Sequence, residues 1–436
     1  MNVATKRDLV SELAGTKIKS YSRTDEVLRD ASLTYLKNNG LPISKSEEYR
    51  FTPVTRMLEK EFDSLTIATP GSSVSSISKY LIPELNGNVL VFVNGVYASH
   101  LSRIVSSPDQ VIIKPLSKAV VENQEVVEAV LGKKEDYTKD AFTAINTALW
   151  SEGVFLHVAK NTKIKETVFL LSINDATQSN VSVHTRIVAL IEQGSELTLV
   201  ERFESIGKEA AFHTHIEEMI VKEDAVLNYY KIQNDPGKSI QVCNTLIHQS
   251  DRSHVNTCTL TMNGEVVRNN FSISIDGENC ESHFNGLYLL NGNTLADNHT
   301  IVDHLKPNSF SNELYKGVMD GHSKGVFNGK IYVRPHAQKT NAFQSNRNVL
   351  LTDTATVNTK PQLEIWADDV KCSHGCTSGQ LDEEALFYLQ SRGISKDAAR
   401  AMLLYAFAAD VIAPVKDEKL KAYFDQLIAE RLQKNF

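Results

Sequence analysis

The chain has 436 residues, of which 42% are hydrophobic and 23% charged, with a formal net charge of −7; this fits two or three domains or one elongated domain with flanking modules. The composition indicates neither a nucleic-acid-binding protein, which would show a basic stripe with interleaved aromatics, nor a secreted or membrane-spanning one, which would show an apolar signal segment or an apolar run of about 18 residues. The five scattered cysteines fit reduced thiols better than a disulfide framework, so we expect a cytoplasmic protein.

The first part of the chain, residues 1–152, is expected to form a mostly helical domain. A helix is predicted to open at Thr24–Glu26 and to stop at Gly40, because apolar residues follow at helical spacing until this glycine. The dipeptide Asn94–Gly95 between two apolar runs predicts a β-hairpin, since this pair favours the conformations of a two-residue turn. A second helix is predicted at about Asp140–Trp150.

Residues 153–370 show short strand patterns that recur at a nearly fixed interval. Leu197, Val226 and Val255 are each 29 residues apart, at similar points of their segments. Further positions follow at intervals of 27, 27 and 29 residues: Ser282, Ser309 and Gln338. Strand-only repeats of this size predict a β-helix, because each coil can bury its apolar face only against its neighbours. The alternative is a β-sandwich, whose turns would recur about every 8–12 residues.

Three polar groups in this region invite comparison with enzymes. His213–Glu217 contains an H-x-H pattern like that of β-barrel metal sites, but the acid follows too early, and an ordinary cluster on a coil is favoured. Asp297, His299 and Asp303 share one face of a strand, as solvent-facing polar residues of a solenoid commonly do. Asp368–Asp369 could suggest the paired acids of β-helix glycosidases, but adjacent strand residues point to opposite faces.

Motifs for nucleotide binding and hydrolysis are either incomplete or not followed by the secondary structure that they require. The nearest match to a phosphate-binding loop, Gly325–Ile331, is one residue short and lacks the hydroxyl that holds magnesium. Gly321–Gly325 matches G-x-S-x-G in letters, but a strand-like run follows it instead of a helix, so a turn between coils is favoured. We therefore expect a protein without catalytic activity of its own.

The densest group of possible metal ligands is Cys372, His374 and Cys376. Thiolate and neutral imidazole are the ligands that iron and zinc prefer in proteins. In an extended segment this spacing places all three side chains on one face. The residues alone also allow a plainer interpretation, a buried thiol beside a surface imidazole.

The last part of the chain, residues 371–436, is expected to be helical. Asp382 is a suitable N-cap for a first helix, Ser395 caps a second one that Pro414 ends, and Lys416–Gln433 form a third. The second helix is apolar almost all round, so it is either deeply buried or docks a partner.

Three stretches contain long, contiguous sequence motifs of a known family. The first reads LEIWADDVKCSHG and then GQLDEEALFYLQSRGIS, between Leu363 and Ser395. The second begins with DNHTIVDH at Asp297 and continues through YKGVMD, GVFNGKIYV and AQKTNAFQSNRNVLLTDTA to Ala355. A fainter third, SKSEEYRFTPV, covers Ser44–Val54. Together they resemble the SufB/SufD family of the SUF iron–sulfur cluster assembly system.

Within this family the chain resembles the SufD type more than the SufB type. SufB sequences carry a thiol in a Q-C-D-S-type stretch, where this chain has Gln344–Asn346. They also read H-E-A-T where this chain has His374–Thr377. Cys376, in turn, stands where SufD sequences more usually have alanine.

The resemblance implies a mainly β fold with a right-handed parallel β-helix between helical ends. It implies a non-catalytic scaffold that pairs with a SufB-like paralogue and binds the ATPase SufC through its C-terminal helices. Whether the chain forms a homodimer when alone is left open by the sequence. No tightly bound cofactor is expected. His374 and Cys372 would contact a transient iron ion or nascent cluster at the boundary with SufB, whereas a role for Cys376 is doubtful because the family pattern does not include it.

Two other classes of function stay open on the residues alone. A carbohydrate-active β-helix enzyme would need converging acids in a groove and a secretion signal. A solenoid interaction protein with a structural zinc would need Cys372, His374 and Cys376 as joint ligands.

Overall fold

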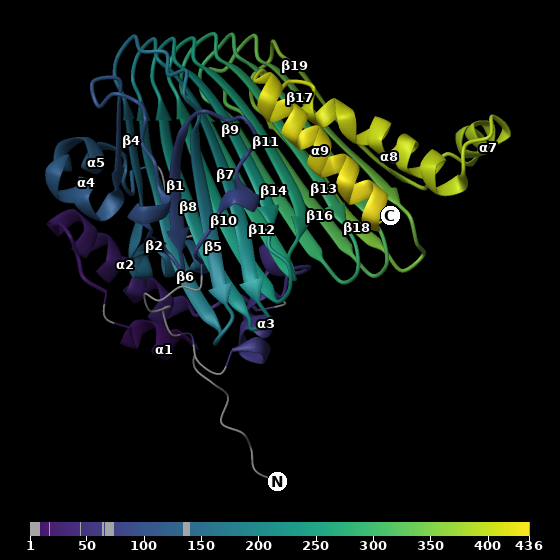
Figure 1. Cartoon of the computed structure of the whole chain (residues 1–436). Coiled ribbons are helices and arrows are strands. Elements are labelled where there is room, and N and C mark those ends of the chain that lie inside the picture. Colours follow the sequence, from purple (N-terminus) through teal and green to yellow (C-terminus); the bar gives the residue numbers. More distant parts are fainter. Residues whose placement is uncertain are drawn as a thin grey trace.

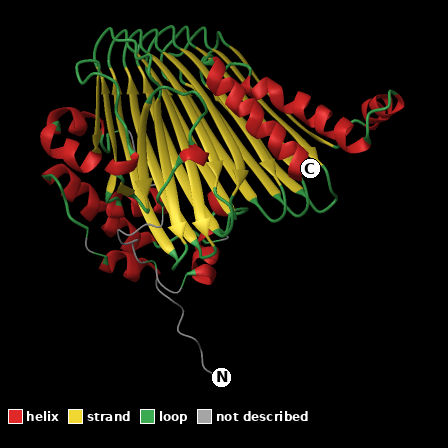
Figure 2. Ribbon diagram, viewed as in Figure 1, coloured by secondary structure: helices red, strands yellow, loops and turns green. Residues whose placement is uncertain are grey.

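The computed structural model describes residues 9–16, 18–43, 45–62, 65, 74–133 and 140–435. Two long sheets face each other and form a flattened solenoid, with helices outside them (Figures 1 and 2). One sheet has the order β19-β17-β15-β13-β11-β9-β7-β5-β1-β2, and the other β18-β16-β14-β12-β10-β8-β6-β4-β3. The predicted β-helix is therefore confirmed.

The ten-stranded sheet consists of β1 (Asn88–Val93), β2 (Val96–Tyr97), β5 (Val168–Ala176), β7 (Glu196–Gly207), β9 (Val226–Asn234), β11 (His254–Asn263), β13 (Glu281–Leu290), β15 (Phe310–Met319), β17 (Asn341–Leu350) and β19 (Lys371–Gly379). The nine-stranded sheet consists of β3 (Val111–Pro115), β4 (Glu152–Val158), β6 (Val181–Ile191), β8 (Ala211–Val221), β10 (Ser239–Gln249), β12 (Val266–Ile275), β14 (Leu295–His304), β16 (Lys324–Val333) and β18 (Thr356–Ile365). From β4 onward the chain alternates between the sheets, so each coil adds one strand to each.

The strand register corrects part of the predicted repeat. Val255 pairs with Ser282, as the spacing predicts. Leu197, however, pairs with Leu227 rather than with the predicted Val226. Ser282 pairs with Ser311 rather than with the predicted Ser309, and Ser311 pairs with Ala342 rather than with the predicted Gln338, which lies in the turn before β17. The turns between strands differ in length, so a constant interval loses the register along the chain.

The interior between the sheets has an apolar side and a polar side. On the apolar side, the second half of each strand in the nine-stranded sheet packs against the first half of a strand in the ten-stranded sheet. The residues there include Met219, Val221, Leu227, Ile247, Val255 and Ile273. On the other side, buried polar side chains line the middle coils, among them His213, His215, Glu217, Gln233 and Gln241. Apolar burial holds the coils together, while the polar side must satisfy its hydrogen bonds within the solenoid.

Helices from the first part of the chain cover the outer face of the nine-stranded sheet. They are α1 (Leu9–Gly15), α2 (Arg23–Asn39), η1 (Glu47–Tyr49), α3 (Val54–Glu61), α4 (Leu116–Glu122), α5 (Gln124–Val130) and α6 (Ala141–Leu149), with the short turns η2 (Ser78–Tyr80) and η3 (Ser99–Leu101) against the other sheet. The two predicted helices are α2 and α6, and the Asp140 side chain caps α6. The predicted hairpin is confirmed, since Phe92 pairs with Tyr97 across Asn94–Gly95.

The C-terminal part of the chain forms helices beside the ten-stranded sheet. They are α7 (Glu383–Ser391), α8 (Lys396–Ile412) and α9 (Glu418–Asn435), and Asp382 and Ser395 cap the first two as predicted. Of these helices, α8 and α9 cover the outer face of the sheet. Leu404 and Phe424 pack into the same apolar cluster as Leu287 of β13. In Figure 1, α8 and α9 lie along the strands, whereas α7 projects away from the solenoid.

Strands of the solenoid lie on both sides of the predicted core boundaries at residues 153 and 370. β1, β2 and β3 precede this range, and β19 follows it. Hence the first and last coils include residues that the sequence patterns assign to the flanking helical parts. None of the helices in the described part of the chain is both long and apolar enough to cross a membrane.

Candidate functional site

The last coil of the solenoid carries the predicted ligand residues. β19 pairs with β17 and β18 with β16, and neither strand has a partner on its other side within the described residues. Most side chains of β19 are exposed. Two unpaired sheet edges therefore end the solenoid side by side, and such edges readily pair with another chain.

The three candidate ligands project from the interior face of β19. In the register with β17, Cys372 lies beside Ala342, His374 beside Gln344, and Cys376 beside Asn346. All three β17 residues are buried inside the solenoid. The common face expected from strand periodicity is therefore present, while metal binding by these residues stays a prediction.

The environments of the three side chains differ. Cys372 is half-buried against the apolar interior, and burial raises the pKa of its thiol. The side chain of His374 is exposed. Cys376 Sγ lies 3.0 Å from Thr359 Oγ1 and 3.8 Å from Asn346 Oδ1. Among these three residues, only His374 presents an exposed ligand group that makes no hydrogen bond within the described part of the chain.

These residues do not form a joint tetrahedral site. A strand rises about 3.3 Å per residue, so the Cα atoms of Cys372 and Cys376 are about 13 Å apart. Zinc–sulfur bonds are about 2.3 Å long, too short for both thiolates to reach one ion from a straight strand. The geometry of β19 therefore argues against the structural-zinc alternative.

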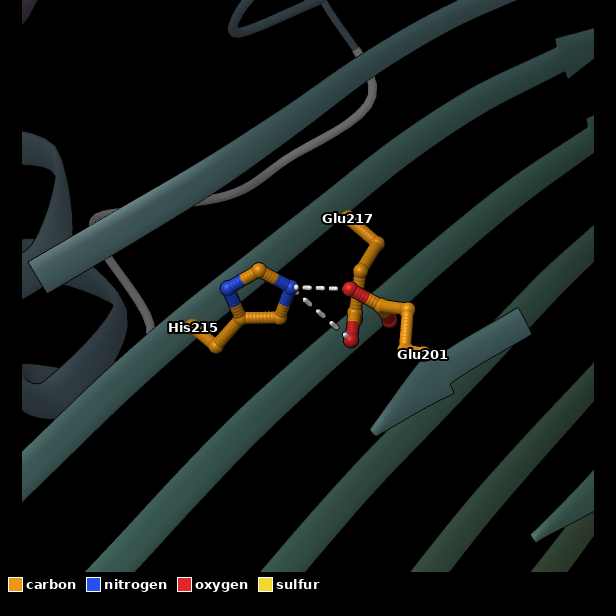
Figure 3. A group of neighbouring side chains, drawn as sticks. All are labelled: Glu201, His215 and Glu217. Carbon is orange, nitrogen blue, oxygen red and sulfur yellow. Dashed lines mark hydrogen bonds and ion pairs between the residues drawn. The ribbon is translucent and has the colours of Figure 1, made fainter. Parts of the chain in front are cut away.

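One group in the described part of the chain brings three possible ligand atoms together: Glu201, His215 and Glu217, with these atoms within 4.8 Å of one another. His215 Nε2 lies 2.9 Å from Glu201 Oε1 and 3.5 Å from Glu217 Oε1 (Figure 3). β8 supplies His215 and Glu217, and β7 of the facing sheet supplies Glu201. The group is buried on the polar side of the interior, facing the opposite sheet.

The partners of this group close it into a hydrogen-bond network. Lys231 Nζ lies 2.6 Å from Glu217 Oε1, and the Tyr229 hydroxyl contacts both carboxylates. Thr185 Oγ1 shares a 2.6 Å hydrogen bond with His215 Nδ1. Burial raises the pKa of Glu217, although the Lys231 ammonium acts in the opposite direction. Lys231 already provides the positive charge that a metal ion would bring to Glu217. We therefore interpret the group as a structural network whose hydrogen bonds link the middle coils.

Sequence patterns pointed to His215 and Glu217 but missed Glu201 and Lys231. Glu201 lies on the other sheet, and no local spacing connects it with a histidine 14 residues away. Knowledge of the strand register would have indicated both residues, because Glu201 and Lys231 are direct partners in neighbouring coils, where opposite charges can pair.

The polar residues of β14 separate into two groups. His299 Nε2 lies 2.9 Å from Asp297 Oδ1, and His299 Nδ1 lies 3.2 Å from Glu48 Oε2 of η1. Asp303 instead pairs with Arg334 at 2.8 Å. The three residues therefore do not converge on one ion. Asp297 and His299 contribute to the contact between the segment of residues 45–54 and the sheet, beside cavities of about 350 and 320 Å³.

The enzyme-like motifs have ordinary structural roles. Asp369 pairs with exposed Lys339 in a turn, and Asp368 is exposed. Ser323, the serine of G-x-S-x-G, is buried in the turn between β15 and β16, where its hydroxyl donates to the Leu290 carbonyl oxygen at 3.3 Å. A converging acid pair or an exposed nucleophilic serine is thus not found at these motifs.

Comparison with known proteins identifies relatives along most of the chain. The sequence profile described as SUF system FeS cluster assembly, SufBD core domain, matches residues 173–407, and that of the SufBD protein N-terminal region matches residues 14–170. The chain is 29% identical to the iron–sulfur cluster assembly protein SufD of Escherichia coli, covering 92% of this chain and 91% of that one. SufD of Bacillus subtilis is 28% identical over 77% of each chain. A SufBD family protein of Synechocystis is 28% identical over 92% of this chain and 90% of its own.

Proposed function

Because the chain belongs to the SufBD family of the SUF iron–sulfur cluster assembly system, we propose that it is a non-catalytic, SufD-type scaffold subunit. The observation that carries this proposal is the last coil, where His374 and Cys372 project from the interior face of an unpaired edge strand. A scaffold must offer ligands that a second subunit can complete, and an unpaired strand edge supplies both the ligands and the surface for pairing.

The partner at this edge would be a SufB-like paralogue. A second solenoid of similar cross-section can extend both sheets by pairing with β18 and β19 through backbone hydrogen bonds. Its ligands would then lie near His374 and Cys372 at the boundary. A homodimer through the same edges is the expected state when the paralogue is absent. The high pKa of the Cys372 thiol means that iron or a cationic partner group must favour the thiolate before it can serve as a ligand.

The ATPase SufC would bind at the junction of α7 and α8. Phe387, Tyr388 and Met402 are exposed here, at 72%, 56% and 51% of their full accessibility. Large exposed apolar side chains gathered on adjoining helices are typical of a protein interface. The chain itself lacks a phosphate-binding loop, so it needs such a partner to use ATP.

The test is anaerobic co-expression of the chain with a SufB-like and a SufC-like protein, followed by purification and analysis of iron, sulfide and zinc. We expect a stable ternary complex that holds iron and sulfide, and no ATPase activity in the isolated chain. A complex that forms but never holds iron and sulfide would contradict the scaffold role. Zinc bound by the isolated chain and lost in His374→Ala would instead support the structural-zinc alternative.

Docking of the ATPase is tested by point substitutions rather than by deletion of the helices. Removing α8 and α9 would uncover the apolar outer face of the ten-stranded sheet, so loss of binding could result from misfolding. Phe387→Ala with Tyr388→Ala removes only exposed surface and is expected to abolish co-purification with the ATPase. Phe51→Ala, at a phenylalanine that is 44% exposed in the N-terminal segment, is the matched control and should leave the complex intact.

A further inference from the structure

Three polar side chains form a row on the interior face of the last strands of the ten-stranded sheet. Glu313 of β15 pairs in register with Gln344 of β17, and Gln344 with His374 of β19. Neighbouring strands lie about 4.8 Å apart, so side chains on the same face at paired positions are within contact range of each other. Gln344 thus stands between a buried carboxyl group and the exposed histidine of the candidate site.

The amide group of Gln344 is held in one orientation. Its Nε2 atom donates to Glu313 Oε2 at 2.7 Å, and both side chains are buried, with 3% and 1% exposure. Gly329 on the facing sheet leaves the room that the amide occupies, because a Cβ atom at this glycine would lie 2.3 Å from Gln344 Nε2. With the NH₂ end directed at Glu313, the carbonyl oxygen is the end left for another partner.

This carbonyl oxygen, Gln344 Oε1, is buried and has no hydrogen-bond partner in the described part of the chain. A buried acceptor without a hydrogen bond destabilises the folded chain, so a donor close by is expected. The strand beyond Gln344 is β19, and the side chain in register on it is His374, which carries a ring N–H in either neutral tautomer.

We propose that Gln344 is a positioning residue for His374: its Oε1 atom accepts a hydrogen bond from one ring nitrogen and so directs the other nitrogen toward the iron or nascent cluster. Histidines that bind metals commonly donate their second ring N–H to such an acceptor, which fixes the tautomer and the ring orientation. The inference rests on the proposed function only in assigning the free nitrogen to iron. The hydrogen bond itself needs no partner subunit, but it requires the exposed His374 ring to turn toward Gln344, because the two side chains are not hydrogen-bonded in this structure.

The experiment measures the tautomer of His374 in the metal-free protein by NMR with ¹⁵N-labelled histidine, using His374→Ala to assign the signal. We expect a single dominant tautomer in the unchanged chain, although the ring is exposed. Gln344→Leu removes the acceptor at similar volume and should give the mixture of tautomers of a free imidazole. Gly329→Ala displaces Gln344 without altering its chemistry and should shift the ratio in the same direction.

Gln362→Leu is the matched control, because Gln362 on neighbouring β18 also has a buried, unpartnered Oε1 atom but lies in register with Lys330 rather than beside His374. It should leave the His374 signal unchanged. Thermal unfolding of each variant shows that it folds. Unchanged His374 tautomers in folded Gln344→Leu and Gly329→Ala would overturn the proposal.

Cluster assembly is measured separately on the complex with its partners. Loss of an acceptor behind a metal-binding histidine typically lowers metal affinity or activity by about 10- to 100-fold, so Gln344→Leu should lower the iron and sulfide yield by about tenfold or more. A shifted tautomer with an unchanged yield in both Gln344→Leu and His374→Ala would show that the hydrogen bond exists but that the ligand role of the proposed function is wrong.

Discussion

Cys376 Sγ and Thr359 Oγ1 lie 3.0 Å apart, so a thiol on β19 contacts a hydroxyl on β18 across the last coil. This contact joins the two edge strands at the end of the solenoid, where no further coil follows among the described residues. It also gives the Cys376 thiol a partner within its own chain. His374, two residues earlier on the same face, has no such contact and remains exposed.

The first prediction is that His374 contributes more to cluster formation than Cys376. His374→Ala should abolish SUF-dependent cluster maturation in a strain that relies on this pathway, because a labile site loses an accessible ligand. Cys372→Ala should impair maturation, since the thiol is half-buried but lies on the same face. Cys376→Ala should be close to the unchanged protein, with complex assembly intact in all three variants.

The reverse outcome would show that the assignment is wrong. If Cys376→Ala were inactive and His374→Ala active, the thiol nearest Thr359 would be the ligand, and its contact with the hydroxyl would have to open for binding.

The second prediction concerns Arg431, which fixes α9 to the solenoid. Its guanidinium is buried and donates to the carbonyl oxygens of Met262 and Leu289 at 2.7 and 3.0 Å and to Asn291 Oδ1 at 2.9 Å. Arg431→Lys keeps the charge but cannot reproduce this fork, so we expect a loss of about 1–3 kcal/mol in unfolding free energy by urea titration. Arg392→Lys, at an exposed position after α7, should change it by less than about 0.5 kcal/mol.

The third prediction is a pH-dependent gain in stability from Glu313→Gln. Burial raises the pKa of Glu313 from 4.5 to about 7. A carboxyl group with a raised pKa in the folded state supplies stability that is complete below pH 4.5 and is lost as the pH rises through 7. The amide does not titrate, so the unfolding free energy of the variant should gain on that of the unchanged chain between about pH 4.5 and 7, by about 2–3 kcal/mol in all at pH 8, and the two pH slopes should differ only within this interval.

Exposed Glu278→Gln is the control for this comparison. The difference in unfolding free energy between this variant and the unchanged chain should be the same at pH 8 as at low pH. A parallel pH dependence of the Glu313→Gln variant and the unchanged chain would contradict the raised pKa.

Local patterns predicted the elements whose causes are local. Asp382 and Ser395 cap their helices because each side chain accepts from backbone N–H groups two or three residues on, which sequence spacing alone reveals. Asn94–Gly95 forms its turn because both residues adopt positive φ angles, 50° and 74°. The β-helix was predictable because every coil repeats the same burial of strands against neighbours.

Contacts between coils could not be predicted from the sequence patterns, because they depend on the register of the strands. The spacing placed Gln338 where the structure has Ala342, a shift that would also misplace every later residue of the strand relative to its neighbours. Without the register, nothing connects Gln344 with His374. Glu201 was missed for a related reason, since its contact with His215 crosses from one sheet to the other. The candidate ligand residues of β19 could be proposed from the chain, but the residues that surround them could not.

The fourth prediction concerns acid release of the N-terminal helices. Burial alone would raise the pKa of the Asp297 carboxyl, but Arg268 and His299 outweigh it and hold this pKa at about 2. His299 and Lys330 lower the pKa of Glu48 on η1 to about 2 as well. Glu48 joins η1 to the sheet through His299 and Lys330, and Asp297 accepts a hydrogen bond from the Thr52 hydroxyl of the same N-terminal segment. Their usual pKa values are 3.8 and 4.5, so the unfolded chain binds these protons at higher pH than the folded one, and the stability that they supply is lost as the pH falls from about 4.5 toward 2.

Trp150 can report this release, because it is buried and its ring packs against Arg29 of α2, with 4.6 Å from the guanidinium carbon to the ring centroid. In a Trp366→Phe background we expect its fluorescence to change cooperatively between about pH 4.5 and 2. Asp297→Asn leaves buried Arg268 without its counter-charge, which should cost about 3 kcal/mol at neutral pH and flatten the acid transition, since one titrating group is gone. Asp303→Asn, on the same face of β14 but paired with Arg334, should keep the transition of the unchanged chain. Equal acid slopes in the Asp297→Asn and Asp303→Asn variants would show that the Asp297 carboxylate does not hold the N-terminal helices on the sheet.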